Sequence, residues 1–498
     1  MTVTPDRLSY GFAKSRGIIF RGGEAPAFLI KRGGDRLALL EARRAVGRTW
    51  PVEDVDAPQF DRALSDIYAF SDAEAGSLGD QAEGESLSSI IDEIAPTADL
   101  LDSASDAPII RLINGLIAEA IRTAASDIHV EPYEDRVSVR YRIDGVLSER
   151  ASLAPALASP LVSRIKVMSR LDIAEKRVPQ DGRLSLTLGG KGVDVRVATL
   201  PSRFGERVVL RLLDKDQARF MLDQLGMGPA NLTAMKQALA QPNGIILVTG
   251  PTGSGKTTTL YSTLKSLATP EVNVCTLEDP IEMVEPAFNQ MQVQAGIDLG
   301  FAEGVRALMR QDPDIIMVGE IRDLETADMA IQAALTGHLV LSTLHTNDAP
   351  SAITRLLDLG VPSYLINATL LGIMAQRLVR TLCPHCKQPQ PAQDSDNELW
   401  DHLVAPWKAA RPKQLQRPQG CLECRMTGYS GRIGIYEILL MSPELRKIIN
   451  TETNISALRE QANREGMKPL RISGAQKVAA GLTTLEEVLK TSPPAEQN

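Results

Sequence analysis

The sequence predicts an α/β protein built from several domains. A chain of 498 residues is too long for a single hydrophobic core. Four segments between residues 137 and 212 alternate apolar and polar side chains with period two, which is typical of half-buried strands. From residue 221 to 380, continuous apolar strands alternate with helices, which indicates a parallel sheet covered on both faces.

Composition and charge exclude some classes of function. Apolar residues make up 43% and charged residues 23% of the chain, the usual range for globular domains. The net charge of −8 argues against broad binding to nucleic acid, and no nucleic-acid partner is expected. This acidity is local, because the stretch from Ala63 to Ile110 holds eleven Asp or Glu and no Lys or Arg, which leaves about +3 for the rest.

No targeting or membrane segment is expected. The first forty residues lack a basic region followed by a sustained apolar core, so no secretory signal is predicted. The most apolar long stretch, residues 360–375, is interrupted by polar residues and is too short to span a bilayer, so it is interpreted as a buried helix. We therefore expect the chain to reside in the cytosol.

Composition along the chain predicts the domain boundaries. Residues 1–70 combine short apolar runs with Gly-Gly turns, which suggests a small α/β or α-rich module. Residues 71–106 shift to Ser, Gly, Ala, Asp and Glu, so a flexible acidic linker is expected there, with a possible short helix at 90–94. This linker is either a solvated tether or a docking peptide.

Four further segments follow the linker. Residues 107–215 begin with an amphipathic helix and continue with the period-two strands 137–143, 184–188, 193–197 and 208–212, and form a second α/β domain. Residues 216–380 form the domain with the parallel sheet. Two Cys pairs define a metal-binding subdomain at 381–435, and 436–498 is a helical segment with a disordered tail.

The strongest motif joins a buried strand, 244–249, to a helix that ends at Leu267. The turn between them is a P-loop, in which glycines let backbone N–H groups surround phosphate oxygens. Lys256 is expected to reach the outer phosphates and the Thr257 hydroxyl to bind Mg²⁺. The predicted ATP-binding residues are Gly250, Pro251, Thr252, Gly253, Ser254, Gly255, Lys256, Thr257 and Thr258.

Acidic residues follow the next two strands. Glu278 and Asp279 end the strand at 272–277, and Glu320 comes two residues after the strand at 314–318, in a variant of the Walker B pattern. Glu320 is interpreted as the residue that positions the attacking water, with Glu278 and Asp279 helping through the water shell of the metal. The predicted catalytic set is Glu320, Glu278 and Lys256; the alternative is that the acids only cap strand ends.

Two histidines and four arginines complete the candidate site. His338 and His345 bracket the strand 339–343, which is expected to lie beside the Walker B strand, so both histidines are predicted to sense the γ-phosphate. A neighbouring domain or subunit must supply positive charge to the transition state of phosphoryl transfer. The candidates for this role are Arg196, Arg211, Arg306 and Arg310, although most surface arginines are simply solvated.

Four of the five cysteines form two C-x-x-C pairs. The pairs are Cys383 with Cys386 and Cys421 with Cys424, a spacing that favours one tetrahedral Zn²⁺ site. Disulfides are disfavoured in a cytosolic chain, and four sulfur ligands leave no open position, so the zinc is expected to be structural. Cys275 lies in a strand and is interpreted as a packed thiol.

Taken together, these motifs resemble the secretion ATPases of the type II and type IV pilus superfamily. The resemblance rests on the P-loop, on 277–282, on 318–323, on 336–345 and on the paired C-x-x-C, and the segments 126–129 and 174–183 extend it over nearly the whole chain. It implies a RecA-like ATPase domain with a Zn-binding insertion, preceded by a PAS-like domain and a small N-terminal module.

The resemblance also implies partners and an assembly. It suggests a homo-hexamer in which ATP binds between the RecA-like and preceding domains, with Arg196 and Arg211 matching the arginines that reach the nucleotide. The N-terminal module would dock on the cytoplasmic domain of a bitopic inner-membrane platform protein, beside a polytopic one. The chain would then lie at the cytoplasmic face of the inner membrane and power pseudopilus assembly and protein export across the outer membrane.

Chain length and the start at 8–13 are more similar to the type II secretion branch than to the usually longer pilus assembly ATPases. Three alternatives remain. They are a type IV pilus assembly ATPase, a RecA-like motor that depends on nucleic acid, and a non-enzymatic scaffold gated by ATP, which would not need Glu320.

Overall fold

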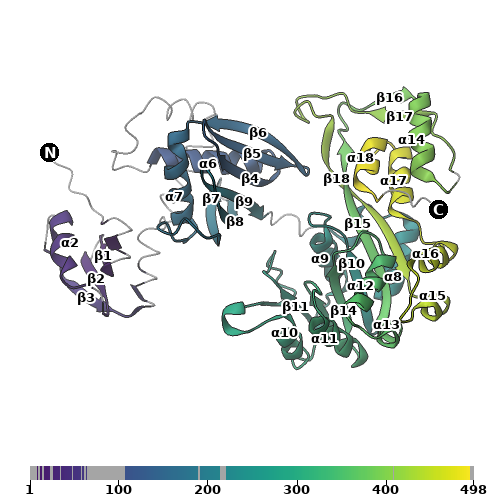
Figure 1. Ribbon diagram of the computed structural model, residues 1–498, viewed down its shortest axis with the longest axis horizontal. Coiled ribbons are helices and arrows are strands. Elements are labelled where there is room, and N and C mark those ends of the chain that lie inside the picture. Colours follow the sequence, from purple (N-terminus) through teal and green to yellow (C-terminus); the bar gives the residue numbers. More distant parts are fainter. Residues whose placement is uncertain are drawn as a thin grey trace. The chain divides into compact units, whose positions relative to one another are not determined.

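The computed structural model describes most of the chain (Figure 1). The described residues are 107–188, 191–213, 220–407 and 409–493, together with 8, 12–13, 16–22, 26–33, 35–46, 49–57, 59–60 and 63. The predicted acidic linker 71–106, including the possible helix at 90–94, lies outside them. The chain divides into two compact units, Met1–Asp214 and Lys215–Asn498, and each is considered by itself.

The first described segment is a small α/β module. Its strands β1 (Ile18–Arg21), β2 (Ala27–Lys31) and β3 (Val52–Val55) form one sheet in that order, antiparallel and then parallel. Helix α2 (Ala38–Val46) lies between β2 and β3 and buries a stripe of small apolar side chains spaced four residues apart against the sheet core. Of the two options left open for this region, the described residues follow the α/β one.

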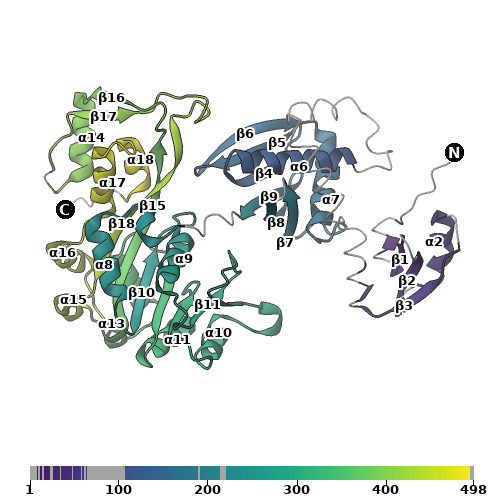
Figure 2. The ribbon, with the colours of Figure 1, turned by 180° about the vertical axis from the view of Figure 1, so that it is seen from behind.

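A six-stranded antiparallel sheet organises the second domain. Its strand order is β6-β5-β4-β9-β8-β7. Helices α6 and α7 pack on one face of this sheet, on β4 and β9, and bury its apolar side chains (Figure 2). The elements are α6 (Ala107–Arg122), β4 (Ala125–Pro132), β5 (Val137–Ile143), β6 (Val146–Leu153), α7 (Ala158–Met168), β7 (Gln180–Leu188), β8 (Lys191–Ser202) and β9 (Gly205–Leu213).

All four strands expected from the period-two pattern are present in this sheet. The unpredicted strands are β4 and β6. In β4 almost every side chain is buried, and in β6 most side chains are exposed, so neither strand shows clean alternation.

The second unit is centred on a seven-stranded sheet with the order β12-β11-β13-β14-β10-β15-β18. The first six strands are parallel, and only β18 runs antiparallel to its neighbour. Its elements are α8 (Pro229–Leu239), β10 (Gly244–Thr249), α9 (Lys256–Leu267), β11 (Val274–Glu278), β12 (Asn289–Gln292), α10 (Phe301–Leu308), β13 (Ile315–Val318), α11 (Leu324–Leu335), β14 (Leu339–Leu344), α12 (Pro350–Asp358), α13 (Ser363–Thr369), β15 (Leu370–Leu382) and β18 (Tyr429–Leu440).

Helices cover both faces of this sheet, as the continuous apolar strands indicate. Along β10, Ile245 and Leu247 belong to the core that includes α11 and α12, whereas Ile246 and Val248 belong to the core that includes α8 and α9. Because successive side chains of a strand point to opposite faces, a strand buried on both sides must be apolar throughout. The expected doubly covered parallel sheet is confirmed.

The buried helix expected at residues 360–375 is wrong beyond Thr369. Only Ser363–Thr369 is helical, and the chain continues as the long strand β15, which lies between β10 and β18. A run of apolar residues has no period that separates a buried helix from a central strand, which explains the error. The last strand of the sheet, β18, comes from beyond residue 380, so the cysteine-containing segment is inserted between two neighbouring strands.

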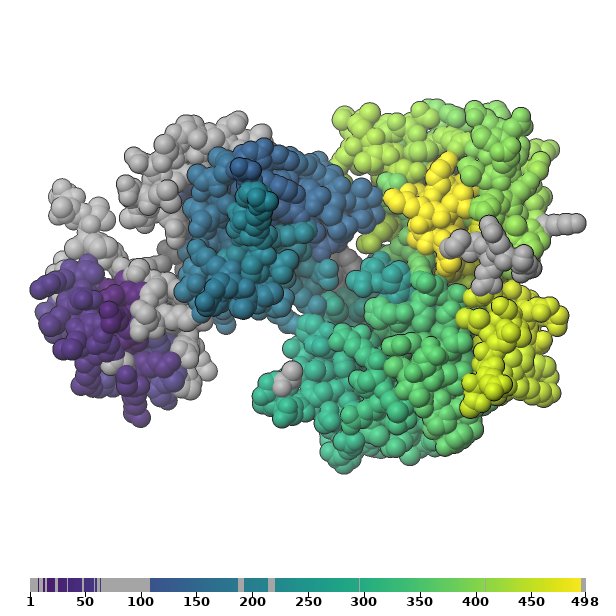
Figure 3. Space-filling view, in the orientation of Figure 1, coloured from purple at the N-terminus to yellow at the C-terminus, as the bar shows by residue number. Residues whose placement is uncertain are grey.

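Within the second unit, the insertion packs against the last two helices of the chain, where the yellow end of the chain meets the green insertion (Figure 3). The insertion contains β16 (Gln388–Pro391), α14 (Asp394–Val404) and β17 (Gln414–Arg417). The C-terminal helices are α15 (Pro443–Ile448), α16 (Ile455–Arg464), α17 (Leu470–Ala479) and α18 (Leu485–Thr491). Among the described helices, none combines the length and apolarity that crossing a membrane requires.

Candidate nucleotide and metal sites

The P-loop joins the carboxyl end of β10 to the amino end of α9. Gly253 and Gly255 have φ values of 79° and 86°, in the left-handed region that favours glycine. A Cβ at Gly250 would lie 2.5 Å from the carbonyl oxygen of Gln376 on β15. The loop therefore needs glycine both for its turns and for its close approach to the neighbouring strand.

Lys256 and Ser254 give this loop the chemistry of a phosphate site. The Lys256 ammonium donates to the carbonyl oxygens of Gly250 and Pro251 at 2.8 and 3.1 Å, within the loop itself. Burial lowers the pKa of Lys256 to about 8, against the opposing charge of Glu320. The buried Ser254 hydroxyl has no hydrogen-bond partner among the described residues. A cation and an unpartnered hydroxyl at a helix N-terminus fit a bound phosphate.

Glu320 lies just past the carboxyl end of β13, two strands from the P-loop strand. One carboxylate oxygen pairs with Arg322 at 2.5 Å, and the other lies 3.6 Å from Nε2 of His345. Burial, together with the nearby charge of Lys256, lowers the pKa of His345, so this imidazole is neutral at pH 7. Glu320 and His345 therefore meet at the edge of the sheet that also carries the P-loop.

His338 does not belong to this cluster, which corrects the expectation that both histidines line the nucleotide edge. The parallel register pairs Gly244 with Leu339 and Thr249 with Leu344, so His338 precedes the amino end of β14. It is separated from the P-loop edge by the length of the strand, about 20 Å. Its Nδ1 atom lies 2.8 Å from the carbonyl oxygen of Ala333, at the end of α11. Histidines that bracket one strand necessarily lie at its opposite ends.

Glu278 is held in a buried polar network. The Tyr261 hydroxyl donates to both Glu278 carboxylate oxygens, at 2.9 and 2.8 Å, and Thr276 and Gln290 add donors at 2.8 and 3.2 Å. Tyr261 follows Thr257 by one turn of α9, so the network ties the P-loop helix to the end of β11. These hydrogen bonds give the Glu278 carboxylate a structural role, which is to hold α9 against the end of β11. Its catalytic role stays a prediction.

The four candidate arginines occupy two places. Arg196 on β8 and Arg211 on β9 are register partners, and the Arg211 guanidinium pairs with Asp127 on β4 at 2.9 Å. Arg306 lies in the last turn of α10 and Arg310 two residues beyond it, where Arg310 donates to the carbonyl oxygen of Arg306 at 2.9 Å. The sheet thus brings Arg196 and Arg211 side by side, whereas the α10 pair is separate from them in sequence and fold.

The four cysteines converge as the C-x-x-C spacing predicts. All four Sγ atoms lie within 4.8 Å of one another, and the described residues contain no other such cluster. The separation of Cys383 from Cys421 is 3.8 Å, and Cys386 and Cys421 each lie 3.7 Å from Cys424. Tetrahedral ligands about 2.3 Å from a zinc ion are separated by about 3.8 Å, so the arrangement fits Zn²⁺.

Backbone donors support the same interpretation. The N–H groups of Cys421 and Gly428 both donate to the Cys424 sulfur at 3.2 Å. Burial alone would raise the pKa of Cys424, but these donors outweigh it and lower the pKa to about 6, which favours the thiolate that zinc requires. Cys275 is a buried free thiol in β11, in agreement with the sequence interpretation.

Sequence reasoning missed Gln376 and Arg377 on β15. The Gln376 amide oxygen accepts from Thr259 of α9 at 2.7 Å, and a Cβ at Gly250 would lie 3.1 Å from the buried Arg377 guanidinium. Both residues lie directly against the P-loop although they follow it by more than a hundred residues. No local pattern could reveal them, because their position depends on β15 pairing with β10.

Comparison with known proteins agrees with this geometry. A model of the type II/IV secretion system proteins matches residues 102–490, and a model of an N-terminal domain of GSPII protein E matches residues 7–68. A Pseudomonas aeruginosa protein named type II secretion system protein E is 49% identical over 490 residues, 98% of this chain and 96% of its own length.

A pilus ATPase and a solved structure also match. The type IV pilus assembly ATPase TfpB of Acinetobacter baylyi is 55% identical over 391 residues, 78% of this chain and 66% of the relative. The crystal structure of the pilus retraction motor PilT with bound ADP has 27% identity and a TM-score of 0.52, covering 75% of this chain and 95% of PilT. The resemblance inferred from the motifs is confirmed, and the chain belongs to the type II/IV secretion system protein family.

Proposed function

We propose that this protein is an ATP-hydrolysing motor of the type II secretion system. The observation that carries the proposal is the cluster formed by Lys256, Glu320 and His345 at one edge of a parallel sheet. Lys256 supplies positive charge for the outer phosphates, and Glu320 lies where a carboxylate can orient a water molecule. The relative named type II secretion system protein E, which aligns over nearly the full chain, supports the secretion role.

The residues of the P-loop have distinct roles in the proposed reaction. Backbone N–H groups of residues 250–257 surround the phosphates, and the Thr257 hydroxyl holds Mg²⁺, which neutralises charge on the phosphate oxygens when bound. Glu320 must leave Arg322 before it can orient water freely, since the two side chains form an ion pair. The neutral His345 beside Glu320 is suited to accept or donate one hydrogen bond to the terminal phosphate.

The proposed assembly is a homo-hexamer at the cytoplasmic face of the inner membrane. In it, Arg196 and Arg211 of the second domain face a nucleotide and stabilise the phosphoryl-transfer transition state. The N-terminal module binds the cytoplasmic domain of a bitopic platform protein, next to a polytopic one. Zn²⁺ at Cys383, Cys386, Cys421 and Cys424 holds the inserted subdomain together. ATP turnover then drives pseudopilus assembly.

The test is ATP turnover of the full chain with and without the cytoplasmic domain of the platform protein. We expect the partner to stimulate turnover, and Lys256→Ala and Glu320→Gln each to reduce it by about a hundredfold or more. Nucleotide binding should persist in Glu320→Gln, because Glu320 acts on water rather than on the phosphates. Wild-type levels of turnover in either variant would overturn the assignment of the site.

A second candidate, a type IV pilus assembly ATPase, is favoured by the 55% identity to TfpB. It requires the same chemistry and a different partner. Stimulation by a pilus platform protein and not by the type II one would select it. Turnover that ignores both partners and rises with single-stranded nucleic acid would instead indicate a nucleic-acid-dependent motor.

A further inference from the structure

The loop that follows β14 is joined directly to the P-loop strand. The Thr249 hydroxyl accepts from the backbone N–H of Thr346 at 2.8 Å and lies 2.8 Å from the Thr346 hydroxyl. Thr249 is the residue before Gly250, and Thr346 is the residue after His345. These contacts between Thr249 and Thr346 help to fix the position of His345 relative to the phosphate-binding turn. A displacement of Thr346 would therefore affect His345 and Gly250 together.

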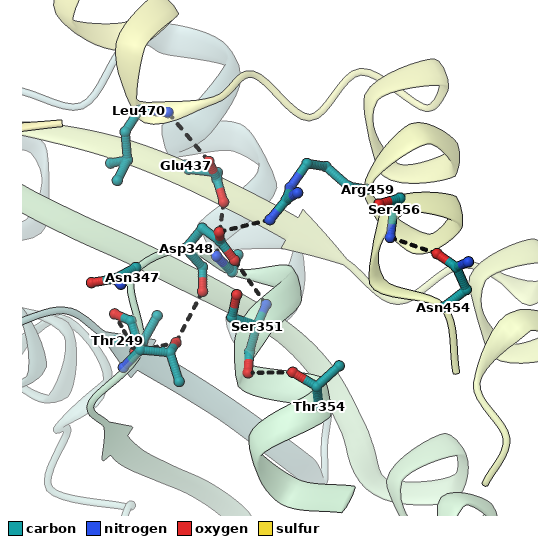
Figure 4. A network of polar contacts seen from close by, with 12 residues as sticks. Thr249, Asn347, Asp348, Ser351, Thr354, Glu437, Asn454, Ser456, Arg459 and Leu470 are labelled. Atoms are coloured by element: carbon teal, nitrogen blue, oxygen red, sulfur yellow. Dashed lines mark hydrogen bonds and ion pairs between the residues drawn. The ribbon is translucent and has the colours of Figure 1, made fainter. Parts of the chain in front are cut away.

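The same loop is anchored on the C-terminal helix α16. Asp348 accepts from the Ser351 N–H with one carboxylate oxygen at 2.8 Å and pairs through the other with Arg459 of α16 at 2.8 Å (Figure 4). The Thr346 hydroxyl donates to the carbonyl oxygen of Asp348 at 3.0 Å. The path from Arg459 to Thr249 consequently runs through only two residues, each linked by a hydrogen bond or ion pair.

Two further groups hold this loop from other sides. Glu437 of β18 accepts from the Ala349 N–H at 2.8 Å and from the Leu470 N–H at 3.2 Å, and so links the loop to the start of α17. Arg377, which lies against Gly250, donates to the carbonyl oxygen of Asn347 at 3.0 Å. Each residue from 346 to 349 thus makes a hydrogen bond or an ion pair to another element. The partner of Asp348 is on α16, and the partner of Ala349 is on β18.

We propose that the ion pair between Asp348 and Arg459 is a positioning device for ATP hydrolysis, through which α16 holds His345 and the P-loop strand in their working arrangement. The inference rests on the proposed function and adds the C-terminal helices to it. Arg459 does not touch the nucleotide site; it acts through Asp348 and Thr346. A small displacement of catalytic groups lowers the rate of the chemical step more than it lowers binding.

Helix packing does not depend on this pair. Leu458 and Ala462 of α16 lie in the same buried core as Ile353 and Leu356 of α12, on which α16 packs. The side chains of Arg459 and Asp348 keep 20% and 17% of their exposure. Loss of the pair should therefore leave the apolar contact intact, so that its effect on turnover is measurable in a folded protein.

The experiment compares Arg459→Gln with Arg464→Gln in the full chain. Arg464 lies on the same helix and pairs with Glu460 at the surface, where the two side chains are 66% and 65% exposed, so it is a matched control. We expect Arg459→Gln to lower kcat about tenfold with the KM for ATP changed less than threefold, and Arg464→Gln to match the wild type. Arg459→Lys, which keeps the charge, should recover part of the rate.

The double variant of Arg459→Gln with Asp348→Asn adds a second measurement. Because both changes break the same pair, it should be no slower than Asp348→Asn alone. A kcat for Arg459→Gln within twofold of the wild type would overturn the inference while leaving the proposed function standing. Equal losses in Arg459→Gln and Arg464→Gln would also overturn it, by indicating a general effect on α16. Absence of ATP turnover in the wild type would overturn the proposed function and this inference together.

Discussion

At the scale of the residue, Glu437 is a fully buried carboxyl group with a raised pKa. Burial raises its pKa to about 7, while two backbone N–H groups and the charge of Arg459 favour ionisation. The nearby Asp348 carboxylate raises the pKa further. Glu437 therefore changes its charge near neutral pH, in a position that joins the P-loop side of the sheet to α17.

A pH-dependent stability follows from this pKa. A carboxyl group whose folded pKa exceeds its unfolded value stabilises the fold fully below the unfolded pKa of about 4.5 and loses this contribution as pH rises through about 7. Glu437→Gln cannot titrate. We expect the free energy of unfolding of the wild type, relative to that of Glu437→Gln, to fall by roughly 2 kcal/mol between pH 5 and pH 8.

Urea unfolding of both proteins at the two pH values provides the measurement. Asp348, Arg459 and Arg377, the charged groups that interact with Glu437, are the same in both proteins, so their own titration largely cancels in the difference. A difference that stays constant from pH 5 to pH 8 would show that Glu437 is ionised throughout.

Sequence analysis predicted those residues whose role is written in a local pattern. The P-loop, Glu320 and the cysteines each lie in a short motif, and the structure places the cysteines together and Glu320 on the P-loop edge. Glu437 and Arg377 lie on long strands among apolar residues, with no motif around them. Their importance appears only once β15 and β18 are paired with the strands of the P-loop domain.

At the scale of the element, the insertion that carries the four cysteines connects the two strands of one long antiparallel pair. Strands β15 and β18 pair from Gly372–Leu440 to Leu382–Tyr429, and the insertion joins their far ends. Inside it, β16 and β17 form only a two-stranded sheet. Such a small sheet has little core of its own, and we propose that Zn²⁺ bound at the four cysteines stabilises the insertion together with the packing of α14 on α17 and α18.

Removal of zinc should therefore loosen the insertion before it affects the P-loop domain. After treatment with a chelator, we expect proteolysis between Cys383 and Cys424 to accelerate at least about tenfold, with nucleotide binding unchanged. Mass spectrometry of the fragments locates the cleavage sites, and Cys421→Ser should reproduce the effect without a chelator. Equal cleavage rates with and without metal would show that the insertion holds its shape by other contacts.

Elements with a clear period were predictable, and those without one were not. The strands at 137–143 and 244–249 and the helix that ends at Leu267 have the expected bounds. The sequence predicts a buried helix over residues 360–375, but residues 370–375 begin strand β15, because a helix and a central strand bury such an apolar run equally well. His338 was misplaced for a related reason, since proximity in sequence to His345 is not proximity across a strand.

At the scale of the whole molecule, the P-loop and two of the four candidate arginines, Arg196 and Arg211, belong to different units. The P-loop lies in the unit Lys215–Asn498, and Arg196 and Arg211 lie in the unit Met1–Asp214. We propose that a complete site, in the proposed hexamer, takes one unit from each of two copies. Testing this arrangement requires two inactive variants that can complement each other in a mixed assembly.

Lys256→Ala and Arg211→Ala should each abolish most ATP turnover, and a mixture of the two proteins should regain part of it. At equal amounts, about a quarter of neighbouring pairs combine an intact P-loop with an intact arginine, so roughly a quarter of the wild-type rate is expected after subunit exchange. Turnover of the mixture against each parent is the measurement. A mixture as inactive as its parents would place the arginine on the nucleotide of its own copy, or on none.

The strand β15 has a mechanical consequence. Near its middle, Gln376 and Arg377 form the floor beneath Gly250, and one residue past its end stands Cys383, the first sulfur of the metal site. From Gln376 onward β15 pairs with β18 and no longer with β10, and its extended backbone spans the roughly 20 Å between the two places. A displacement of the four cysteines would therefore be transmitted to the P-loop along one continuous strand, with no intervening loop.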